Sequence, residues 1–459
     1  MSAEGDTYEN PKDVIIPSIG FFNLVIIIFS NVGSGPAGIE GIVGSAGISN
    51  AIIGITLFPF FWGYIQALFS LELSVKYKKL NGAVGTWAYK IFGRTLGFCA
   101  SVWVLCIQCS TAAFVSEVTS TYIENYKPGT FSNYWSQQGL TLAIILGSFC
   151  INAISIDFTS KTFWVFSVNA LIAFTVLCAY SIPKVDAKRF DNPGTTGKTI
   201  KWSEFINLLV YNSAGYDSSS SLVKYIRDPR QSIPKAMLVV GVAIAFIYLS
   251  TITLPYLAMR DTSAEWQSGH FVVVARELGG HWLEVWILVS CILTNLQIYT
   301  AALQCGAYNA VAMSELGLFP PWFGNRWNGV PFNSLVACAF FSGVFGFVPL
   351  LINLSLESIL YISVMLVEGF CFLAMDSTNR VLAPKTLFWR KIVVMPVFVL
   401  CMYTLTVQNA YVSFVTFSVI LGGFVSSMNR NDELMEEFAE VKDALDVKQA
   451  DYICKDIRL

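Results

Sequence analysis

Long apolar segments, separated by short polar connections, make up most of the chain. Each has roughly the 20 residues that a helix needs to cross about 30 Å of hydrocarbon in a bilayer. The pattern therefore predicts an all-α membrane protein with twelve transmembrane helices, and an even number places both termini on the same side. The predicted spans are 18–47, 50–77, 94–124, 138–155, 162–183, 202–225, 235–258, 280–313, 333–353, 355–377, 388–406 and 409–428.

The first span is interrupted in its own middle. Apolar residues 21–29 are followed by the sequence Ser-Asn-Val-Gly-Ser-Gly-Pro-Ala-Gly-Ile-Glu at 30–40. The glycines at 33 and 35 lower helix stability and Pro36 removes a backbone donor, so a regular helix cannot continue here. Inside a membrane, such backbone is tolerated where it lines a polar cavity. We therefore predict that this break forms part of a binding site.

A second interruption lies in the sixth span. Residues 211–217 have the sequence Tyr-Asn-Ser-Ala-Gly-Tyr-Asp, and four serines follow at 218–221. One interpretation is close helix packing, which small residues favour. The other is a second broken helix, because the interruption falls five spans after the first. Broken helices at matching positions of two halves indicate an inverted-repeat transporter with its site near the membrane midplane.

These breaks suggest the domain organisation of the chain. Each half would comprise five spans, and two further helices would follow the second half. We expect cytosolic segments at both termini. The predicted regions are an N-terminal segment at 1–17, a transporter domain at 18–428 with repeats at 18–183 and 202–377 and helices 11 and 12 at 388–428, and a C-terminal tail at 429–459.

The composition supports a membrane protein and argues against several function classes. Charged residues make up 13% of the chain, against roughly 25% in a soluble domain, and the mean hydropathy is +0.58. A net charge of −2 offers no basic surface for nucleic acid. The 11 cysteines are scattered and two histidines are present, so neither a metal site nor a disulfide framework is supported. No nucleophile with an adjacent base is evident, and we expect no enzyme activity and no cofactor.

Basic residues in the polar connections predict the orientation. The connections at 76–94, 224–235 and 380–391 are basic and would share a side with the N-terminus. The positive-inside rule places that side in the cytosol. The connection at 184–201 is also basic but falls on the other side, which weakens this prediction. We expect a multi-pass protein of the plasma membrane, with an organellar membrane as the alternative.

Acidic residues inside the predicted spans are the strongest candidates for chemistry. An ionisable group at the bilayer centre costs about 3 kcal/mol on insertion scales, so its presence requires a reason. Carboxylates that face one cavity without a basic partner would favour a cation or carry a proton. The alternative is a structural role, in which each acid accepts hydrogen bonds from neighbouring Ser, Thr or Tyr side chains. The candidates are Glu40, Glu72, Glu117, Asp217 and Glu368.

Glu40 bears on the class of substrate. It lies about one turn into the half-helix that begins near Pro36, whose free N–H groups would suit a carboxylate ligand. A fixed negative charge at this place competes with an anion and favours an ammonium group. An equally open interpretation is that Glu40 only interacts with the dipole of its own helix.

Several motifs along the chain match one family. Gly-Ser-Gly-Pro-Ala-Gly-Ile-Glu at 33–40 resembles the G-G-P-x-G-x-E signature of the polyamine:proton symporter branch of the amino acid–polyamine–organocation superfamily. Further similarity lies in NGAVGTW at 81–87, YDSSSSLVKYIRDPRQSIPKA at 216–236, MSELGLFP at 313–320 and YISVMLVEGF at 361–370. These motifs extend from the first predicted helix to the tenth.

The resemblance implies both a fold and a mechanism. The fold would be leucine-transporter-like, with two five-helix inverted repeats and with helices 1 and 6 unwound around the substrate. The mechanism would be secondary active uptake, usually driven by protons. Backbone at 33–35 and 213–216 would hold the substrate. Asp217 and Glu368 would be the acids at matching motif positions, with Tyr361 beside them.

Two positions depart from the family pattern. Relatives usually carry a Glu shortly before the Asp/Asn-Pro pair, whereas this chain has Tyr225, so the inner gate is expected to be paired differently. Some proton-coupled amino acid carriers place a lysine midway along the fifth helix, and this region here offers Ser167 and Asn169. Proton coupling through a carboxylate is therefore preferred, and sodium stays open as the coupling ion.

We therefore predict a transporter that imports polyamines such as putrescine or spermidine with protons, by alternating access. The alternative on the same fold is a proton-coupled permease for cationic or neutral amino acids, and a different class is a nutrient sensor that signals through its tail. Expected partners are a small cationic substrate and the lipid bilayer, with no nucleic acid and no obligate protein partner. The coupling proton would bind Glu117, Asp217 or Glu368. The residues expected to bind substrate are Gly33, Ser34, Gly35, Glu40, Glu117, Asn212, Ser213, Tyr216, Asp217, Tyr361 and Glu368.

Overall fold

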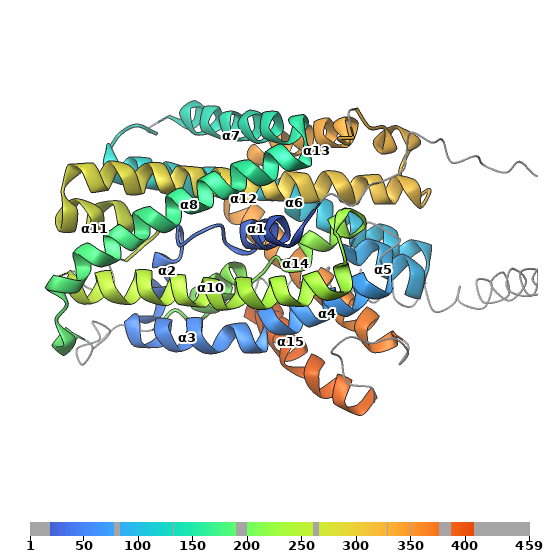
Figure 1. The fold of residues 1–459 in the computed structure, drawn as a ribbon, viewed down its shortest axis with the longest axis horizontal. Helices are drawn as coiled ribbons and strands as arrows, with labels where there is room; N and C mark the ends of the chain where they lie inside the picture. The colour runs from blue at the N-terminus through green and yellow to red at the C-terminus, as the bar shows by residue number, and fades with distance from the viewer. Residues whose placement is uncertain are drawn as a thin grey trace, which may run out of the picture.

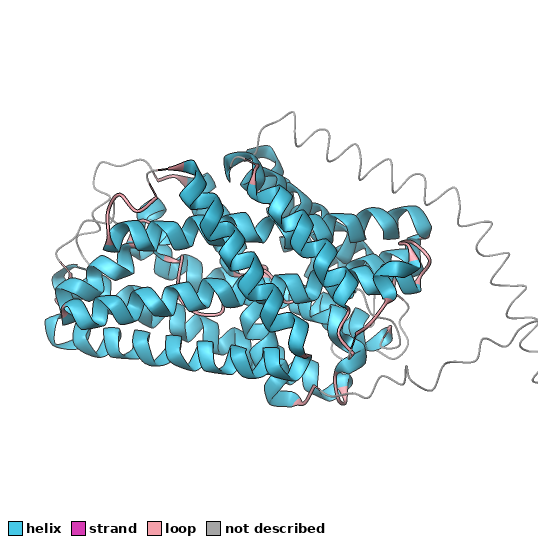
Figure 2. Cartoon of the chain, turned by 90° about the horizontal axis from the view of Figure 1, so that it is seen from above, coloured by secondary structure: helices cyan, strands magenta, loops and turns pink. Residues whose placement is uncertain are grey.

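The computed structural model describes most of the predicted membrane region. The segment 1–17, the twelfth predicted span and the C-terminal tail lie outside the described residues. The regular structure of the described part is helical (Figure 2), apart from two isolated β-bridges. The predicted all-α class is confirmed for this part of the chain. The described residues are 19–77, 83–131, 133–189, 200–259, 266–327, 329–348, 350–375 and 387–407.

Both predicted breaks are present. The first span consists of α1 (Phe21–Val32) and α2 (Glu40–Ala46), which a non-helical segment joins. The sixth consists of α9 (Trp202–Asn212) and the 3-10 helix η4 (Ser218–Tyr225), with turns between them. The prediction of two broken helices is therefore confirmed.

A third interruption lies in the second span, where the sequence analysis predicts a single helix. Here α3 (Ile48–Phe61) ends and α4 (Gly63–Lys76) begins on either side of Trp62. Pro59 lies three residues before this junction. Its ring and its missing N–H weaken the last turn of α3, because the hydrogen bond to the preceding turn is lost.

The other elements follow in chain order. Most are long helices that run along the bundle, and a few are short 3-10 turns. They are α5 (Ala83–Phe92), α6 (Arg94–Tyr126), α7 (Tyr134–Ile154), α8 (Ile156–Ser181), η2 (Ile182–Lys184), η3 (Ala187–Arg189), α10 (Pro229–Ala258), α11 (His270–Gly279), α12 (His281–Glu315), η6 (Pro321–Gly324), α13 (Phe332–Gly346), α14 (Leu350–Ala374) and α15 (Leu387–Val407).

The boundary between the ninth and tenth spans differs from the prediction. The sequence analysis places it between 353 and 355, whereas α13 ends at Gly346 and α14 begins at Leu350. Pro349 precedes α14 in the sequence, and proline favours the start of a helix. Residues 355–358 therefore lie inside α14 and not at its start.

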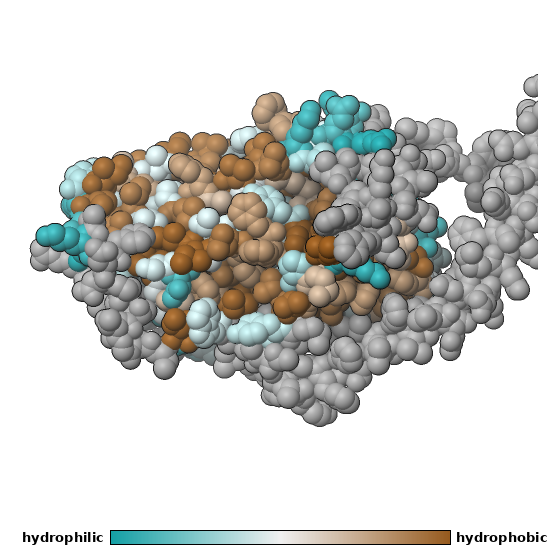
Figure 3. Space-filling view, turned by 90° about the horizontal axis from the view of Figure 1, so that it is seen from below, coloured by the Kyte–Doolittle hydropathy of each residue, from teal (hydrophilic) through white to brown (hydrophobic). Residues whose placement is uncertain are grey.

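The described helices suit a membrane. Seven helical stretches are long and apolar enough to cross a bilayer by length and composition. Large hydrophobic side chains such as Phe22, Phe246 and Phe340 are each more than two-thirds exposed. Figure 3 shows hydrophobic residues over the middle of the surface and hydrophilic residues towards its ends. The seven stretches are Ile48–Lys76, Arg94–Tyr126, Tyr134–Ile154, Ile156–Lys184, Pro229–Ala258, His281–Glu315 and Leu356–Ala374.

Long helices surround the short α1 in the middle of the bundle (Figure 1). Helix α12 packs along α6 and α8, α14 packs on α6, and α10 packs on α1. We call the end of the bundle that carries α5 the near end and the end that carries α11 the far end, on the right and left of Figure 1. The breaks lie between these ends.

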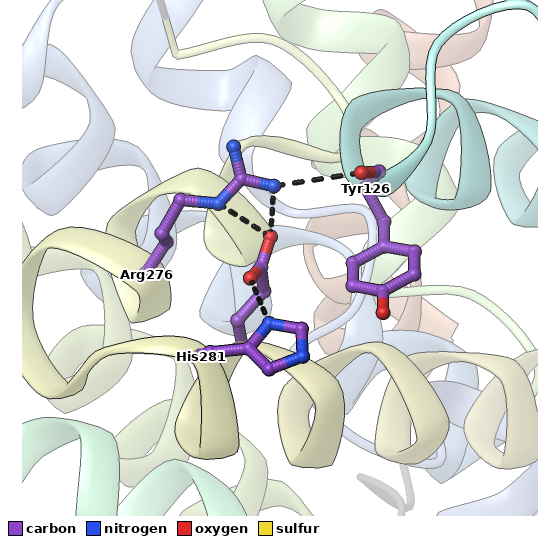
Figure 4. Close-up of polar contacts among 4 residues, drawn as sticks. Tyr126, Arg276 and His281 are labelled. Atoms are coloured by element: carbon purple, nitrogen blue, oxygen red, sulfur yellow. Dashed lines mark hydrogen bonds and ion pairs between the residues drawn. The ribbon is translucent and has the colours of Figure 1, made fainter.

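At the far end, α11 is fastened to two long helices (Figure 4). Arg276 Nε donates a hydrogen bond to Glu284 Oε1 at 2.6 Å, and His281 Nδ1 lies 3.1 Å from Glu284 Oε2. The Arg276 guanidinium also donates to the backbone oxygen of Tyr126, at the end of α6, over 3.5 Å. The cluster thus ties α11 to the first turn of α12 and to the last turn of α6.

Candidate functional site

The two broken helices meet through their backbones. Gly215, in the second break, has φ +101°, and a Cβ atom there would collide with the carbonyl oxygen of Asn31 in α1. Gly33 is confined in a similar way by the hydroxyl group of Tyr248. Glycine permits both the left-handed backbone and the close approach. The glycines that mark the breaks in the sequence therefore allow the two interruptions to pack together.

Replacing Gly215 by alanine is expected to separate the two breaks. The added Cβ collides with backbone at Asn31, and an L-residue at φ +101° is strained as well, so stability should fall by about 1–3 kcal/mol. Uptake should fall with it. Thermal unfolding of the purified protein measures the first effect. Gly147→Ala is the matched control, because its Cβ would meet Leu296 at an ordinary 3.6 Å. Equal stability of the two variants would contradict this account of Gly215.

A cavity of about 190 Å³ lies between the breaks. Backbone of both interruptions lines it, at Gly33 and Gly215, together with aromatic side chains of α6, α9 and α14 and a set of amide side chains. No Lys, Arg or His is among the described residues that line it, and Glu357 is the carboxyl group among them. Its aromatic residues are Phe114, Tyr211 and Tyr361, and its amides are Asn31, Gln108, Asn207, Asn212 and Asn295.

Glu357 is a candidate that the sequence analysis missed. Its side chain is 9% exposed, and its Oε2 atom has no hydrogen-bond partner. The predicted span began at 355, which placed Glu357 at a helix end. In the structure α14 begins at Leu350, about two turns before Glu357. The spacing could have shown it, because Glu357 and Glu368 are 11 residues apart, which is about three turns on one helix face.

Asp217 and Glu368 are buried but do not line the cavity. They lie behind Tyr361, towards the near end. The amide nitrogen of Gln66 donates to Asp217 Oδ1 at 2.8 Å and to the Tyr361 hydroxyl at 2.6 Å. Ser70, one turn further along α4, donates to Glu368 Oε1 at 2.7 Å. A chain of hydrogen bonds therefore runs from the cavity wall at Tyr361 to Asp217.

Asp217 and Glu368, the acid pair, lie beside buried acceptor atoms that have no hydrogen-bond donor. Glu368 Oε2 and Gln66 Oε1 are buried and have no hydrogen-bond partner, and the carboxyl groups of Asp217 and Glu368 lie within electrostatic range of each other. Buried acceptors without donors are costly. One proton placed on Glu368 would supply a donor and would remove the repulsion between the two carboxylates.

Glu40 points into the protein and away from the cavity. Its Oε2 accepts the N–H of Gly38 at 2.9 Å, and its Oε1 accepts the Tyr122 hydroxyl at 2.6 Å and the N–H of Phe271 at 3.5 Å. Tyr122 also receives a hydrogen bond from Gly38 N at 2.9 Å. Glu40 thus fixes the non-helical segment between α1 and α2 and joins it to α11.

Glu117 is separated from the other acids. It lies on a different face of α6, in a second cavity with Gln137, whose amide nitrogen donates to Glu117 Oε2 at 3.2 Å. Glu72 is buried in α4 and does not line the central cavity either. None of the five acids that the sequence singles out lines the central cavity, and Asp217 and Glu368 lie close to each other.

The remaining predicted site residues divide into three groups. Gly33, Asn212 and Tyr361 line the central cavity. Ser213 and Tyr216 line a smaller adjoining pocket with Asn212. Ser34 and Gly35 line neither: the Ser34 hydroxyl donates to the carbonyl oxygen of Ser30 at 2.8 Å, and Gly35 packs against Thr294.

Tyr225 and Arg326 form a pair at the near end. The Tyr225 hydroxyl, at the position where relatives usually carry a Glu, accepts a hydrogen bond from Arg326, whose guanidinium lies 5.7 Å from the Tyr225 ring centroid. Arg326 also lies 3.4 Å from Glu315. Next to Tyr225, Ile19 and Ile226 form a backbone bridge. Arg326 thus joins the segment after η6 to the end of η4 at Tyr225 and to the end of α12 at Glu315.

Within the described residues, no three His, Cys, Asp or Glu side chains gather as they would around a metal ion. Cys106 and Cys109 are both free. The described lining of the central cavity offers backbone groups, amides, aromatic rings and one carboxyl group.

Comparison with known proteins gives the relatives of the chain. The family described as amino acid permease matches residues 19–427. A probable polyamine transporter of Arabidopsis thaliana is 25% identical over 428 residues, which cover 89% of this chain and 86% of the relative. The polyamine transporter PUT1 of Oryza sativa subsp. japonica is 26% identical, covering 67% of this chain and 57% of the relative. The aromatic amino acid transport protein AroP of Escherichia coli strain K12 is 23% identical, covering 65% and 67%.

The family match extends over all the described helices, including both breaks and the cavity between them. The long apolar helices and the hydrophobic surface fit an integral, multi-pass membrane protein of this kind. The chain therefore belongs to the amino acid permease family of membrane transporters, within the amino acid–polyamine–organocation superfamily.

Proposed function

We propose that this transporter imports polyamines of the putrescine and spermidine class together with protons. The full architecture would be twelve helices in a leucine-transporter-like arrangement of two inverted five-helix repeats. Alternating access would take place around the two breaks, in the plasma membrane and with both termini in the cytosol. The relatives named as polyamine transporters support the substrate class.

One observation carries this proposal: the central cavity has a carboxyl group and no basic side chain among its described lining residues. Glu357 is nine-tenths buried and its Oε2 accepts no hydrogen bond. A buried carboxylate oxygen without a hydrogen-bond donor is costly, and an ammonium group brings both a positive charge and three donors to it. The empty acceptor is therefore matched to the head group of an amine.

The rest of the cavity wall suits the remainder of a polyamine. The rings of Phe114 and Tyr211 pack together with their centroids 4.5 Å apart, and Tyr361 also lines the cavity. Aromatic faces accept both methylene groups and further ammonium groups, the latter through cation–π attraction. Amide oxygens of the lining asparagines can accept additional N–H donors.

The amino acid alternative needs free backbone donors for an α-carboxylate, and the structure weakens it. The N–H of Gly38, which follows Pro36 in the first break, already donates to Glu40 and Tyr122. Glu40 also places negative charge at the start of α2, where a carboxylate ligand would otherwise be stabilised. The similarity to AroP keeps this alternative as an outcome of the test below.

Proton coupling would use the Asp217 and Glu368 pair. In a symporter the ion and the substrate bind together, so they require separate sites. Glu357 lies in the cavity, whereas Asp217 and Glu368 lie behind Tyr361. The hydrogen bonds from Tyr361 through Gln66 to Asp217 join the two places. A movement of Tyr361 on substrate binding would thus change the hydrogen bond that Gln66 donates to Asp217.

Sodium is disfavoured at the region of the fifth span where some relatives carry a lysine. The amide nitrogen of Gln297 donates to Ser30 Oγ at 2.6 Å and to Ser167 Oγ at 2.8 Å. Its N–H groups thus lie beside two hydroxyl oxygens that a cation could use as ligands, and they repel a cation placed there. This contact supports the choice of protons as the coupling ion.

The test is an uptake panel in cells that lack their own polyamine uptake. Radiolabelled putrescine should be taken up faster at an external pH of about 5.5 than at about 7.5, and unlabelled spermidine should compete with it. Arginine, lysine and phenylalanine should not compete. Uptake of an amino acid without uptake of diamines would reject the polyamine proposal and favour the alternative permease.

A further inference from the structure

A second cavity of about 370 Å³ lies on another side of α6, between the first turns of α7 and the end of α13. Its size falls in the range of about 300–1,000 Å³ that small-molecule pockets occupy. Glu117 is the charged residue among its described lining residues. Hydroxyl and amide groups of Ser116, Gln137 and Thr141 surround the carboxylate.

The hydrogen bonds in this cavity leave part of the carboxylate available. Gln137 donates to Glu117 Oε2 at 3.2 Å and to Ser116 Oγ at 3.3 Å, while the Ser116 and Thr141 hydroxyls lie 2.7 Å apart. These contacts hold Glu117 in place and do not neutralise its charge. A half-buried carboxylate held by neutral donors favours a cation that can bring its own N–H groups.

Two aromatic rings complete the cavity wall. Tyr134 and Phe347 line it together with Glu117. An ammonium group beside a carboxylate and near aromatic faces gains both a charge-assisted hydrogen bond and cation–π attraction. An anion would be repelled by the Glu117 carboxylate. We propose that this cavity is a second site, which binds the primary ammonium group of an organic amine.

Two sources could supply that ammonium group: a free amine in solution, or the head group of an amine-bearing lipid such as phosphatidylethanolamine. At the start of α7, Tyr134 and Trp135 are 54% and 69% exposed. Exposed Tyr and Trp side chains gather at the membrane interface, at the level of lipid head groups. The cavity is thus placed where either source can reach it.

The second site shares a helix with the central cavity. On α6, Phe114 and Val118 line the central cavity, whereas Ala113 and Glu117 line the second one. An occupant of the second cavity therefore contacts the helix whose other side faces the transported solute. We expect an amine bound in the second cavity to alter the affinity of the central cavity for its solute, because both ligands contact α6.

The test counts bound amines. The full chain is purified into nanodiscs of phosphatidylcholine alone or with phosphatidylethanolamine, and the stoichiometry of radiolabelled putrescine is measured by equilibrium dialysis. In phosphatidylcholine, the unmodified protein should bind two putrescines and Glu117→Gln should bind one. Ala113→Leu keeps the charge but fills the cavity, and it should also bind one. Glu277→Gln, an exposed acid of α11, is the matched control and should bind two.

The lipid arm separates the two sources. Loss of the Glu117-dependent putrescine in discs that contain phosphatidylethanolamine assigns the site to the lipid head group, and its retention assigns it to free amines. Identical stoichiometry for the unmodified protein, Glu117→Gln and Ala113→Leu in both discs would overturn the proposal. Glu357→Gln separates this result from the proposed function, because it should remove the central amine and leave the Glu117-dependent one.

Discussion

Replacing Glu357 by glutamine should sharply weaken the uptake of putrescine and spermidine. The change keeps the shape of the side chain but removes the charge that an ammonium group requires. Loss of a charged hydrogen bond costs about 2 kcal/mol, which corresponds to a roughly thirtyfold increase in KM. Burying a neutral amide costs less free energy than burying an unpaired charge, so the protein should remain at least as stable as before.

The measurement is initial-rate uptake against substrate concentration, corrected for the amount of transporter at the membrane. Glu204→Gln is the control, since Glu204 is 41% exposed and pairs with Lys201 on the surface of α9. It should leave KM unchanged. If Glu357→Gln transported putrescine with an unaltered KM, the carboxylate would not hold the substrate, and the charge argument for the cavity would fail.

Replacing Glu368 by glutamine should uncouple transport from protons. The amide oxygen can still accept the Ser70 hydrogen bond, and the amide nitrogen replaces Oε2, an acceptor that has no hydrogen-bond partner. The site keeps its geometry but cannot exchange a proton. Net uptake driven by a pH gradient should fall roughly tenfold or more, because coupling between bound species is worth about 5–150-fold.

Two readouts separate a coupling defect from a folding defect. Exchange of internal for external putrescine needs no net proton movement, so it should persist in Glu368→Gln, and the dependence of uptake on external pH should flatten. Asp217→Asn retains an acceptor for Gln66 and should behave in the same way. An unchanged pH profile in both variants would place the coupling proton elsewhere.

The breaks could be predicted because their cause is local. Pro36 and its neighbouring glycines forbid a continuous helix whatever surrounds them, so the end of α1 follows from the sequence. For the segment at 213–217 the sequence left close helix packing open, and the structure shows turns there after the end of α9. The interruption at Trp62 was missed, since Pro59 within an apolar run signals a kink or break whose exact place depends on packing.

The positions of the acidic side chains in the folded protein could not be predicted, because they depend on how the helices are rotated against each other. Glu40, expected at the cavity, turns towards Tyr122 and fixes the backbone of the break. Glu117 faces α7. Glu357 was overlooked because a shift of a few residues in the start of α14 separates a helix end from a buried position. Charge pattern identifies such residues, but the packing decides which of them share a cavity.

Transport by the purified protein in liposomes tests the central claim most directly. With an acidic exterior and a neutral interior, labelled spermidine should accumulate above its equilibrium level, and a proton ionophore should abolish the accumulation. A control with equal pH on both sides should show equilibration alone. Liposomes that accumulate an amino acid under the same gradient, while spermidine stays outside, would contradict the assignment of the cavity to a polycation.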